Sequence, residues 1–314
     1  MNKLKIIFAG TEYFSAEHLN ALIVSSHDVI AVITQPDRSS GRGQKIIFSP
    51  VKILSINNQI PIFQPLNLND KNFQNQLLQL NADIMIVVSY GNIIPKIILT
   101  MFPKGCINVH ASLLPRWRGA TPIQSSILYG DKKTGISIIN MNEKIDSGTI
   151  IHSITCSISL KDTTKSLSLK LIKIGIKALL EVLEKIISNT IIAKKQDEKN
   201  VLISKKIHKK DALLDWNLQA KKLERLIRAF NPWPVCYFFL QKKTIRVWQS
   251  SVIPIVQSNF SIGEIICSNK NGIQINTSHQ ILNIEKLQLP GKKIIDVKNV
   301  MLSQKNLFKI GTIV

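Results

Sequence analysis

Three polar side chains in this sequence could form a reaction centre: the amide of Asn108, the imidazole of His110 and the carboxylate of Asp146. Asn108 and His110 are two positions apart in an apolar segment that predicts a strand, so they point to one face about 7 Å apart. Asp146 lies in an Asp-Ser-Gly turn after a second predicted strand at 136–141. Ligands of open α/β sheets bind at the carboxyl ends of the strands, so the three groups stand where a reaction centre is expected.

These groups suit the transfer of an acyl or formyl group to an amine. An amide N–H donates a hydrogen bond to a developing oxyanion, and an imidazole moves protons near neutral pH. The carboxylate would hold the imidazole in one tautomer and favour its charged form. No nucleophilic side chain is needed, because the amine attacks directly. On spacing alone, a hydrogen-bonded Asn-x-His pair without catalytic function is the commoner explanation, so the spacing by itself leaves the question open.

The segments around these residues indicate an α/β domain. Apolar runs at 4–9, 29–34 and 84–88 predict strands, and residues 12–24 and 70–80 have helical spacing. The opening strand–turn–helix is of Rossmann type. It carries one glycine where a dinucleotide-binding loop has three, so we expect no bound dinucleotide. Further helices are predicted at 97–101, 122–129 and 163–187, and a further strand at 149–154.

The last third of the chain indicates a second, smaller domain. Five short strands are predicted within about 80 residues, a pattern typical of a small barrel such as an OB-fold. They are residues 237–240, 244–247, 263–267, 272–275 and 281–287, and a helix at 218–229 precedes them. The polar, Lys-rich residues before this helix predict a solvated linker. We therefore place a Rossmann-like catalytic domain at 1–189, the linker at 190–208 and an OB-like domain at 209–314.

The 314-residue chain carries a formal net charge of +21, which favours a polyanionic partner. Codon bias is an alternative explanation, because the chain has 34 Lys but only seven Arg and is rich in Ile and Asn, as expected of an AT-rich genome. The distribution of the charge is more informative than its total. Residues 209–314 carry 16 basic and six acidic side chains, about twice the net charge per residue of the rest, so the basic surface is concentrated in the second domain.

Other features restrict the class of protein. The longest apolar runs, such as 84–88, are too short to cross a bilayer, and residues 1–3 lead straight into a strand, so we expect neither a membrane helix nor a signal peptide. The four cysteines are widely spaced and form no metal-binding pair, which indicates reduced packing residues in a cytoplasmic protein. We expect a monomer with no metal ion and no membrane partner.

A longer motif surrounds the first two candidate residues. Residues 108–123 read NVHASLLPRWRGATPI and closely resemble the signature of the folate-dependent formyltransferases. Residues 228–234, RAFNPWP, resemble the entry to the C-terminal domain of the same family, so the resemblance covers nearly the whole chain. It implies that Asn108, His110 and Asp146 are the catalytic residues.

The same resemblance implies a site for 10-formyltetrahydrofolate, which would be a cosubstrate. Two turns are expected to line it: the Ser-Leu-Leu-Pro turn of the signature and the Tyr-Gly turn after strand 84–88, which lines the pterin pocket in the family. The residues are Ser112, Leu113, Leu114, Pro115, Tyr90 and Gly91.

Residues 35–52 read QPDRSSGRGQKIIFSPVK, and their glycines, prolines and cations predict a mobile basic loop. Such a loop is usually solvated surface. It nevertheless contains Arg38 and Arg42, and guanidinium groups suit phosphates and guanine edges. The segment resembles the loop by which family members acting on initiator tRNA grip its acceptor arm, which implies that Arg38, Arg42 and Lys45 contact tRNA.

The sequence thus predicts a two-domain enzyme that transfers a formyl group from 10-formyltetrahydrofolate to the methionine of initiator methionyl-tRNA. One rival is a formyltransferase or hydrolase acting on a small amine or on water, and the tRNA-type loop and basic second domain argue against it. Another rival is a catalytically silent RNA-binding protein, and the intact trio argues against that.

Overall fold

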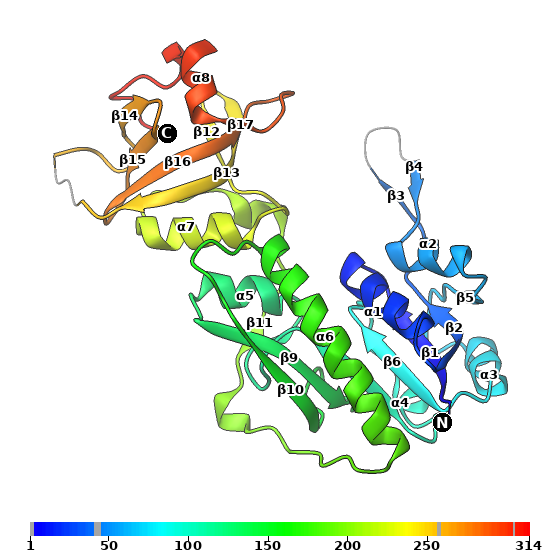
Figure 1. Cartoon of the computed structure of the whole chain (residues 1–314). Coiled ribbons are helices and arrows are strands. Elements are labelled where there is room, and N and C mark those ends of the chain that lie inside the picture. The colour runs from blue at the N-terminus through cyan, green and yellow to red at the C-terminus, as the bar shows by residue number, and fades with distance from the viewer. Residues whose placement is uncertain (1–2, 41–44, 256–258, 304) are drawn as a thin grey trace. The chain divides into compact units, whose positions relative to one another are not determined.

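The computed structural model describes residues 3–40, 45–255, 259–303 and 305–314. The chain forms two compact units (Figure 1). Unit 1 contains residues 1–122, 133–157 and 168–205, and unit 2 contains residues 123–132, 158–167 and 206–314. Two short segments of the N-terminal half therefore belong to unit 2, which the sequence did not indicate. The domain boundaries given above stay a prediction.

Unit 1 is built on a seven-stranded mixed sheet of order β10-β9-β7-β6-β1-β2-β5. The five parallel strands are β1 Lys5–Gly10, β2 Asp28–Ile33, β5 Ile62–Phe63, β6 Ile84–Val88 and β7 Cys106–His110. Counted along the chain, they follow the order 3-2-1-4-5 of doubly wound α/β sheets. The order reverses between β1 and β6, so a ligand crevice is expected at the carboxyl ends of these strands and of their neighbour β7.

Two antiparallel strands, β9 Lys133–Asn140 and β10 Ile150–Ser157, extend the sheet beyond β7. Gly135 of β9 has no room for a side chain, because an added Cβ would stand 2.1 Å from the carbonyl oxygen of Ile154 in β10. The strands predicted at 136–141 and 149–154 are confirmed, and both are longer than the apolar runs that indicated them.

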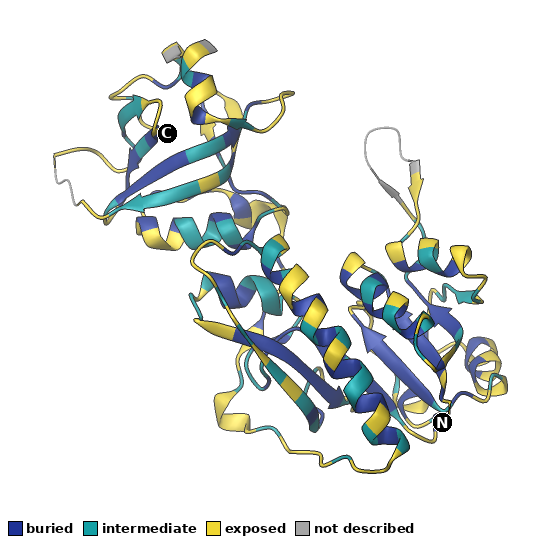
Figure 2. Ribbon diagram, viewed as in Figure 1, coloured by how far each residue is buried: buried dark blue, intermediate teal, exposed yellow. Residues whose placement is uncertain are grey.

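The helices of unit 1 pack on the sheet, whose central strands are buried (Figure 2). One face contacts residues of α3 and α4, which share a buried cluster with Ile7, Ala9 and Met85. Local capping explains two starts: Ser49 caps α2 and Asp70 caps α3, each accepting a hydrogen bond from a backbone N–H three residues on. The bounds are α1 Tyr13–Ile23, α2 Pro50–Asn57, α3 Lys71–Gln79, α4 Lys96–Leu99 and α6 Thr164–Ile187, whose first turn belongs to unit 2.

Helices α1 and α6 meet at a close contact. Gly175 of α6 faces His18 of α1, and a Cβ at this position would stand 2.5 Å from His18 Nε2. Burial lowers the pKa of His18 to about 4, so this imidazole is neutral at physiological pH. It is a packing residue, and its Nδ1 is bonded to the carbonyl oxygen of Phe14 at 2.7 Å.

The basic loop predicted at 35–52 contains regular structure. Strands β3 Arg38–Ser40 and β4 Lys45–Ile47 pair antiparallel as a hairpin before α2. The sequence predicted a mobile basic loop here and did not predict these two strands, although the Ile-rich second arm favours a strand. Residues 41–44 lie outside the described part of the chain.

The segment predicted as a solvated linker, 190–208, is bound to unit 1 over much of its length. The backbone of Lys194 exchanges two hydrogen bonds of 2.8 Å with Ile150. Farther on, β11 Ile203–Ser204 pairs parallel with β8 Arg118–Gly119 in the signature segment. A 3₁₀ turn at Glu198–Asn200 lies between these contacts. We call residues 194–205 the strap, because both of its ends are fixed to unit 1.

Unit 2 contains an antiparallel sheet of order β12-β13-β16-β15-β14, with β17 paired to β16. No pairing joins β12 to β14 among the described residues, so the sheet is open there. All five predicted strands are present, and β13 is much longer than predicted. Their bounds are β12 Tyr237–Leu240, β13 Lys243–Ile253, β14 Ile265–Asn269, β15 Gly272–Asn276, β16 Ile281–Gln288 and β17 Ile295–Asp296.

The helices of unit 2 are α7 Ala220–Ala229, which packs on β13 and β16, and α8 Val297–Ser303. Short 3₁₀ turns occupy Lys209–Ala212 and Lys305–Leu307, and α5 Pro122–Leu128 lies almost wholly in this unit. Arg228 of α7 donates a hydrogen bond of 2.9 Å to the carbonyl oxygen of Asp162, just before α6. In the part of the chain that the structure describes, no helix is long and apolar enough to cross a membrane.

Candidate active site

The three candidate catalytic side chains are in direct contact. Asn108 Nδ2 donates a hydrogen bond of 3.1 Å to Asp146 Oδ1. His110 Nδ1 lies 3.5 Å from Asp146 Oδ2, the oxygen that also accepts a 2.8 Å hydrogen bond from the backbone N–H of Gly119. Residues 38 positions apart in the chain thus converge on one carboxylate, as the sequence predicts.

Strand β7 and the turn after β9 place these groups. Asn108 and His110 lie at the carboxyl end of β7, paired in register with Ile139 and Ser137 of β9. Asp146 has a φ of +49°, a left-handed conformation that Asp tolerates but that its surroundings must hold. The same turn needs Gly148, because an added Cβ would stand 1.6 Å from the carbonyl oxygen of Asn140. The turn therefore folds tightly back onto the end of β9.

The imidazole of His110 lies between two acceptors. Its Nε2 is 2.9 Å from the carbonyl oxygen of Trp117, and its Nδ1 faces Asp146. The side chains of His110 and Asp146 are 6% and 13% exposed, so their interaction is shielded from solvent.

Comparisons with known proteins show the family of the chain. The family model for formyl transferase matches residues 2–183, and the model for the formyl transferase C-terminal domain matches residues 206–305. The chain belongs to the formyl transferase family. It is 82% identical over 313 residues to a methionyl-tRNA formyltransferase from Buchnera aphidicola subsp. Acyrthosiphon pisum, and 65% identical over 314 residues to one from subsp. Schizaphis graminum. Both matches cover the whole of both chains.

Solved structures share the fold at low identity. An N-formyltransferase from Helicobacter canadensis, in complex with folinic acid and dTDP-3-aminofucose, matches with a TM-score of 0.67 and 18% identity, covering 90% of this chain and 99% of that one. HypX from Aquifex aeolicus in complex with tetrahydrofolic acid matches with a TM-score of 0.65 and 14% identity, covering 96% of this chain and 47% of that one.

The turn at 112–115, a folate candidate from its likeness to this family, is fixed to β9. Ser137 Oγ donates to the carbonyl oxygen of Ser112 at 2.8 Å and accepts from the backbone N–H of Leu114 at 3.0 Å. Ser137 is fully buried and pairs in register with His110. One buried hydroxyl thus ties the turn to the strand pair that carries the trio, while Leu113 and Pro115 stay half-buried.

The second folate candidate, Tyr90-Gly91, follows β6. The carbonyl oxygen of Tyr90 accepts hydrogen bonds from Thr11 Oγ1 at 3.1 Å and Gln35 Nε2 at 3.2 Å. Its ring is 2% exposed and belongs to the hydrophobic core, and this burial raises its pKa. Gly91 has a φ of +89°, and a Cβ added there would stand 4.0 Å from Gln35 Nε2. Gly91 is exposed, so the backbone here is more accessible than the Tyr90 side chain.

Two of the three tRNA candidates, Arg38 and Lys45, lie on the β3–β4 hairpin. Arg38 is exposed at the start of β3, and its guanidinium donates to Gln35 Oε1 at 3.2 Å. Lys45 begins β4, and Arg42 lies outside the described residues. Below the hairpin, Lys52 Nζ bonds Asp37 Oδ2 at 2.5 Å and Gln64 Oε1 at 2.8 Å, which anchors its root. Among the described residues, no hydrogen bond or ion pair joins Arg38 to Asn108, His110 or Asp146.

Sequence reasoning missed three residues around the reaction centre: Gly119 and Gln196, which are bonded to Asp146, and Arg118, which is bonded to Gln196. Arg118 and Gly119 belong to the signature segment 108–123, and the resemblance over the whole segment was the signal that could have indicated them. Gln196 is 50 positions from Asp146 in a polar stretch, and no spacing pattern indicates it. Its carboxamide reaches the Asp146 turn only because the strap folds back onto unit 1.

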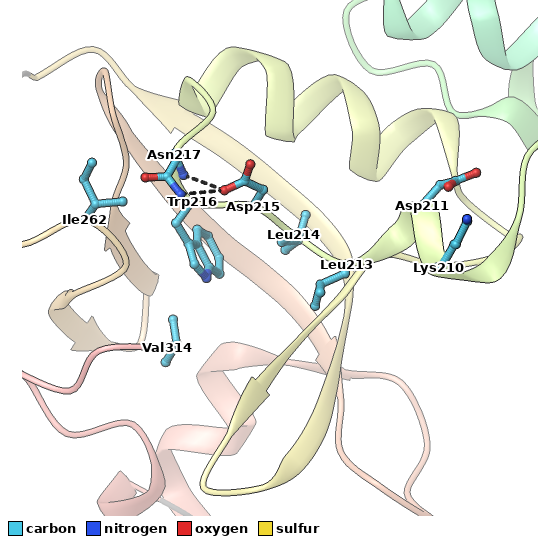
Figure 3. A pocket seen from close by; sticks show the side chains of 9 residues that line it. All are labelled: Lys210, Asp211, Leu213, Leu214, Asp215, Trp216, Asn217, Ile262 and Val314. Carbon is cyan, nitrogen blue, oxygen red and sulfur yellow. Dashed lines mark hydrogen bonds between the residues drawn. The ribbon is translucent and has the colours of Figure 1, made fainter.

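A hollow in unit 2 contains none of the candidate residues. It is lined by residues 213–217 and by Ile262 and Val314, with Asn217 bonded to Asp215 (Figure 3). The Trp216 ring also packs edge-on against the Phe238 ring, with 5.6 Å between the ring centroids, which is a core contact. No group of three or more His, Cys, Asp or Glu able to hold a metal ion occurs within the described ranges.

Proposed function

We propose that this chain transfers the formyl group of 10-formyltetrahydrofolate to the amino group of methionine on initiator tRNA, the reaction that prepares this tRNA for translation initiation. The observation that carries the chemistry is the contact of Asn108 and His110 with the single carboxylate of Asp146. The acceptor is supported by the full-length relative, 82% identical, that is named methionyl-tRNA formyltransferase.

The roles of the trio follow from its hydrogen bonds. Asn108 uses one amide hydrogen on Asp146 and keeps the other for the oxyanion that forms when the methionyl amine attacks the formyl carbon. Protonated His110 would turn its Nε2–H from the Trp117 carbonyl to the same oxyanion, while Asp146 supports the imidazolium. The folate nitrogen N10 takes up a proton as it leaves. The exposed backbone at Gly91 and the fixed turn at 112–115 would hold the folate.

The finer assignment of the two domains belongs to the same proposal. Residues 1–189 would form a Rossmann-like catalytic domain, and the open five-stranded sheet within 209–314 would form an OB-like, tRNA-binding domain after a linker at 190–208. Arg38, Arg42 and Lys45 would grip the acceptor arm. The enzyme would act as a cytoplasmic monomer.

One assay tests the proposal against its rivals. The protein is supplied with 10-formyltetrahydrofolate and one of four acceptors: charged initiator tRNA, elongator methionyl-tRNA, free methionine or none. We expect formylation of the first alone, with release of tetrahydrofolate in step with it.

The other outcomes are equally informative. Formylation of free methionine, or release of formate without an acceptor, would identify a formyltransferase or hydrolase of small substrates. Binding of initiator tRNA with no formyl transfer at all would identify an RNA-binding protein without catalysis.

A further inference from the structure

Gln196 connects the strap to the turn that carries Asp146. Its Nε2 donates two hydrogen bonds of 2.8 Å, one to the carbonyl oxygen of Asp146 and one to that of Gly148. Its Oε1 accepts a hydrogen bond of 3.0 Å from Nε of Arg118. A guanidinium can only donate, so Arg118 fixes which end of the carboxamide faces the turn. Gln196 therefore presents its two N–H donors to the two carbonyl oxygens.

Arg118 is itself held in place. It is 8% exposed, and its terminal nitrogens donate to both carboxylate oxygens of Glu198 at 3.2 and 2.8 Å. The guanidinium hydrogen bond keeps the pKa of Glu198 below its usual value, so this carboxylate stays charged at neutral pH. The next residue, Gly119, donates its N–H to Asp146 Oδ2. Arg118 and Gly119 thus bind Asp146 from two sides, one through Gln196 and one directly.

The strap is anchored before and after Gln196. Lys194 is bonded to Ile150 through two backbone hydrogen bonds. Ser204 Oγ donates to the carbonyl oxygen of Arg118 and accepts from the N–H of Thr121, both at 3.1 Å. Gly119 cannot carry a side chain here, because a Cβ would stand 2.6 Å from the carbonyl oxygen of Ser204. Gln196 is therefore carried by a fixed backbone.

These contacts assign Gln196 a part in the reaction. We propose that Gln196 is a positioning residue that holds the left-handed backbone of Asp146, so that its carboxylate faces Asn108 and His110 together. The inference rests on the proposed function of the trio. A simple structural role for Gln196 would affect folding stability alone, whereas a positioning role lowers the rate of the chemical step with the substrates still bound normally.

The decisive variant is Gln196→Glu, with Gln196→Met as a neutral, similarly shaped second variant. In Gln196→Glu the ionised carboxylate still accepts from Arg118 but cannot donate to the two carbonyl oxygens. A displacement of about 1 Å in a catalytic group lowers rates by up to about 100-fold, so we expect kcat to fall about 10- to 100-fold in both variants. The KM values for folate and tRNA should stay within about twofold, since no substrate contact is removed.

A pH series adds a readout that loss of stability does not produce. As the pH falls, the introduced carboxyl gains a proton and one O–H donor for the turn. The ratio of the Gln196→Glu rate to the wild-type rate should therefore rise toward acidic pH, and the ratio for Gln196→Met should not. The control is Gln76→Glu, which adds the same charge on the exposed face of α3. It should match the wild type.

Asp146→Asn separates the two ideas. If Asp146→Asn loses activity while folded Gln196→Glu and Gln196→Met keep the wild-type kcat, the inference is overturned and the proposed function stands. If Asp146→Asn is fully active, the trio is not the reaction centre and the inference falls with it. A lower kcat in the Gln196 variants, with unchanged melting temperature and KM values, supports the inference. A fall explained wholly by a lower melting temperature, with no change in the pH series, overturns it.

Discussion

The reaction centre and the β3–β4 hairpin hold their polar side chains in different ways. At the reaction centre, the Asp146 carboxylate is contacted by the side chains of Asn108 and His110 and by the backbone N–H of Gly119. The backbone carbonyl oxygen of Asp146 also accepts a hydrogen bond from Gln196. On the hairpin, Arg38 is exposed and its guanidinium donates to Gln35, and Ile46 and Ile47 are 67% and 56% exposed. Among the described residues, Asp37, Lys52 and Gln64 hold the root of the hairpin.

The difference corresponds to two kinds of task. Stabilising a charge that develops during the reaction requires donors that are already in place, because reorganising them would add to the barrier. Gripping a large, hydrated polyanion instead requires exposed cations that can adapt to it. If this comparison is correct, changes at the reaction centre lower kcat, whereas changes at the hairpin lower kcat/KM for tRNA and leave folate use intact.

The largest expected effect is at the trio. In Asn108→Ala and in His110→Asn, single-turnover formylation at saturating substrates should fall about 10²–10³-fold, the usual loss for one oxyanion donor. Binding of tRNA should be largely spared, because both side chains are proposed to stabilise the oxyanion that forms during the reaction. The measurement is rapid-quench formylation of charged initiator tRNA, with tRNA binding followed separately.

Asn75→Ala, on the exposed face of α3, is the matched control and should behave as wild type. Near-normal single-turnover rates in both Asn108→Ala and His110→Asn would remove the trio from the mechanism, and the contrast between the two regions would lose its first half.

The sequence predicts the parts of the molecule that follow local rules. The strand that carries Asn108 and His110 could be predicted because it is short and largely apolar, with its two polar residues at alternate positions and therefore on one face. Strands β6 and β12 match their apolar runs residue for residue. The convergence of Asp146 on this strand was suggested by order along the chain and by resemblance to a family, and the geometry agrees with it.

Long-range contacts of polar residues were beyond prediction. The sequence around Gln196 looks like that of a solvated linker. Only the pairing of the strap with β8 brings the Gln196 carboxamide to the two carbonyl oxygens that it binds. The hairpin was missed for a related reason. Its short strands are stabilised by pairing with each other and by the partly exposed ion pair at the root, and neither is a property of a local window.

The second prediction concerns Arg42. Arg42→Ala should lower kcat/KM for charged initiator tRNA by about 5- to 150-fold if its guanidinium reads a base edge, which corresponds to about 1–3 kcal/mol. The loss should be smaller and strongly dependent on salt if the guanidinium meets phosphate only. Arg42→Lys distinguishes these cases, because an ammonium retains a phosphate contact but cannot form the planar paired bonds. The measurement is kcat/KM at two salt concentrations.

Use of the folate is the internal control for Arg42, since its KM should not change. Wild-type kcat/KM for Arg42→Ala at both salt concentrations would show that Arg42 takes no part in binding tRNA. Recognition of tRNA would then rest on the basic residues of unit 2.

The smallest expected effect is at the root of the hairpin, in Lys52→Met. The ammonium of Lys52 bonds Asp37 and Gln64 and lies 4.2 Å from the centre of the Phe48 ring. One side chain thus contacts the residue before β3, the residue after β4 and the residue after β5. The Lys52 hydrogen bond is also the main reason why the pKa of Asp37 lies below its usual value. Met keeps the length and the apolar stem but removes the charge and the donors. The hairpin should then sample more orientations when free, and ordering it on tRNA should be less favourable.

Partly exposed ion pairs are weak, so we expect Lys52→Met to lower kcat/KM for tRNA only about two- to fivefold, with kcat and the KM for folate unchanged. Lys71→Met on α3 is the matched control, because Lys71 is exposed and lies outside the hairpin.

The pH dependence gives an independent check. A lowered pKa means that the Asp37 pairing stabilises the fold above the usual Asp pKa of 3.8 and loses this effect as the pH falls below it. The difference in melting temperature between wild type and Lys52→Met should therefore shrink in that acidic range. A fall in kcat instead of kcat/KM would contradict the comparison, because it would show that the root of the hairpin acts on the reaction centre rather than on the grip of tRNA.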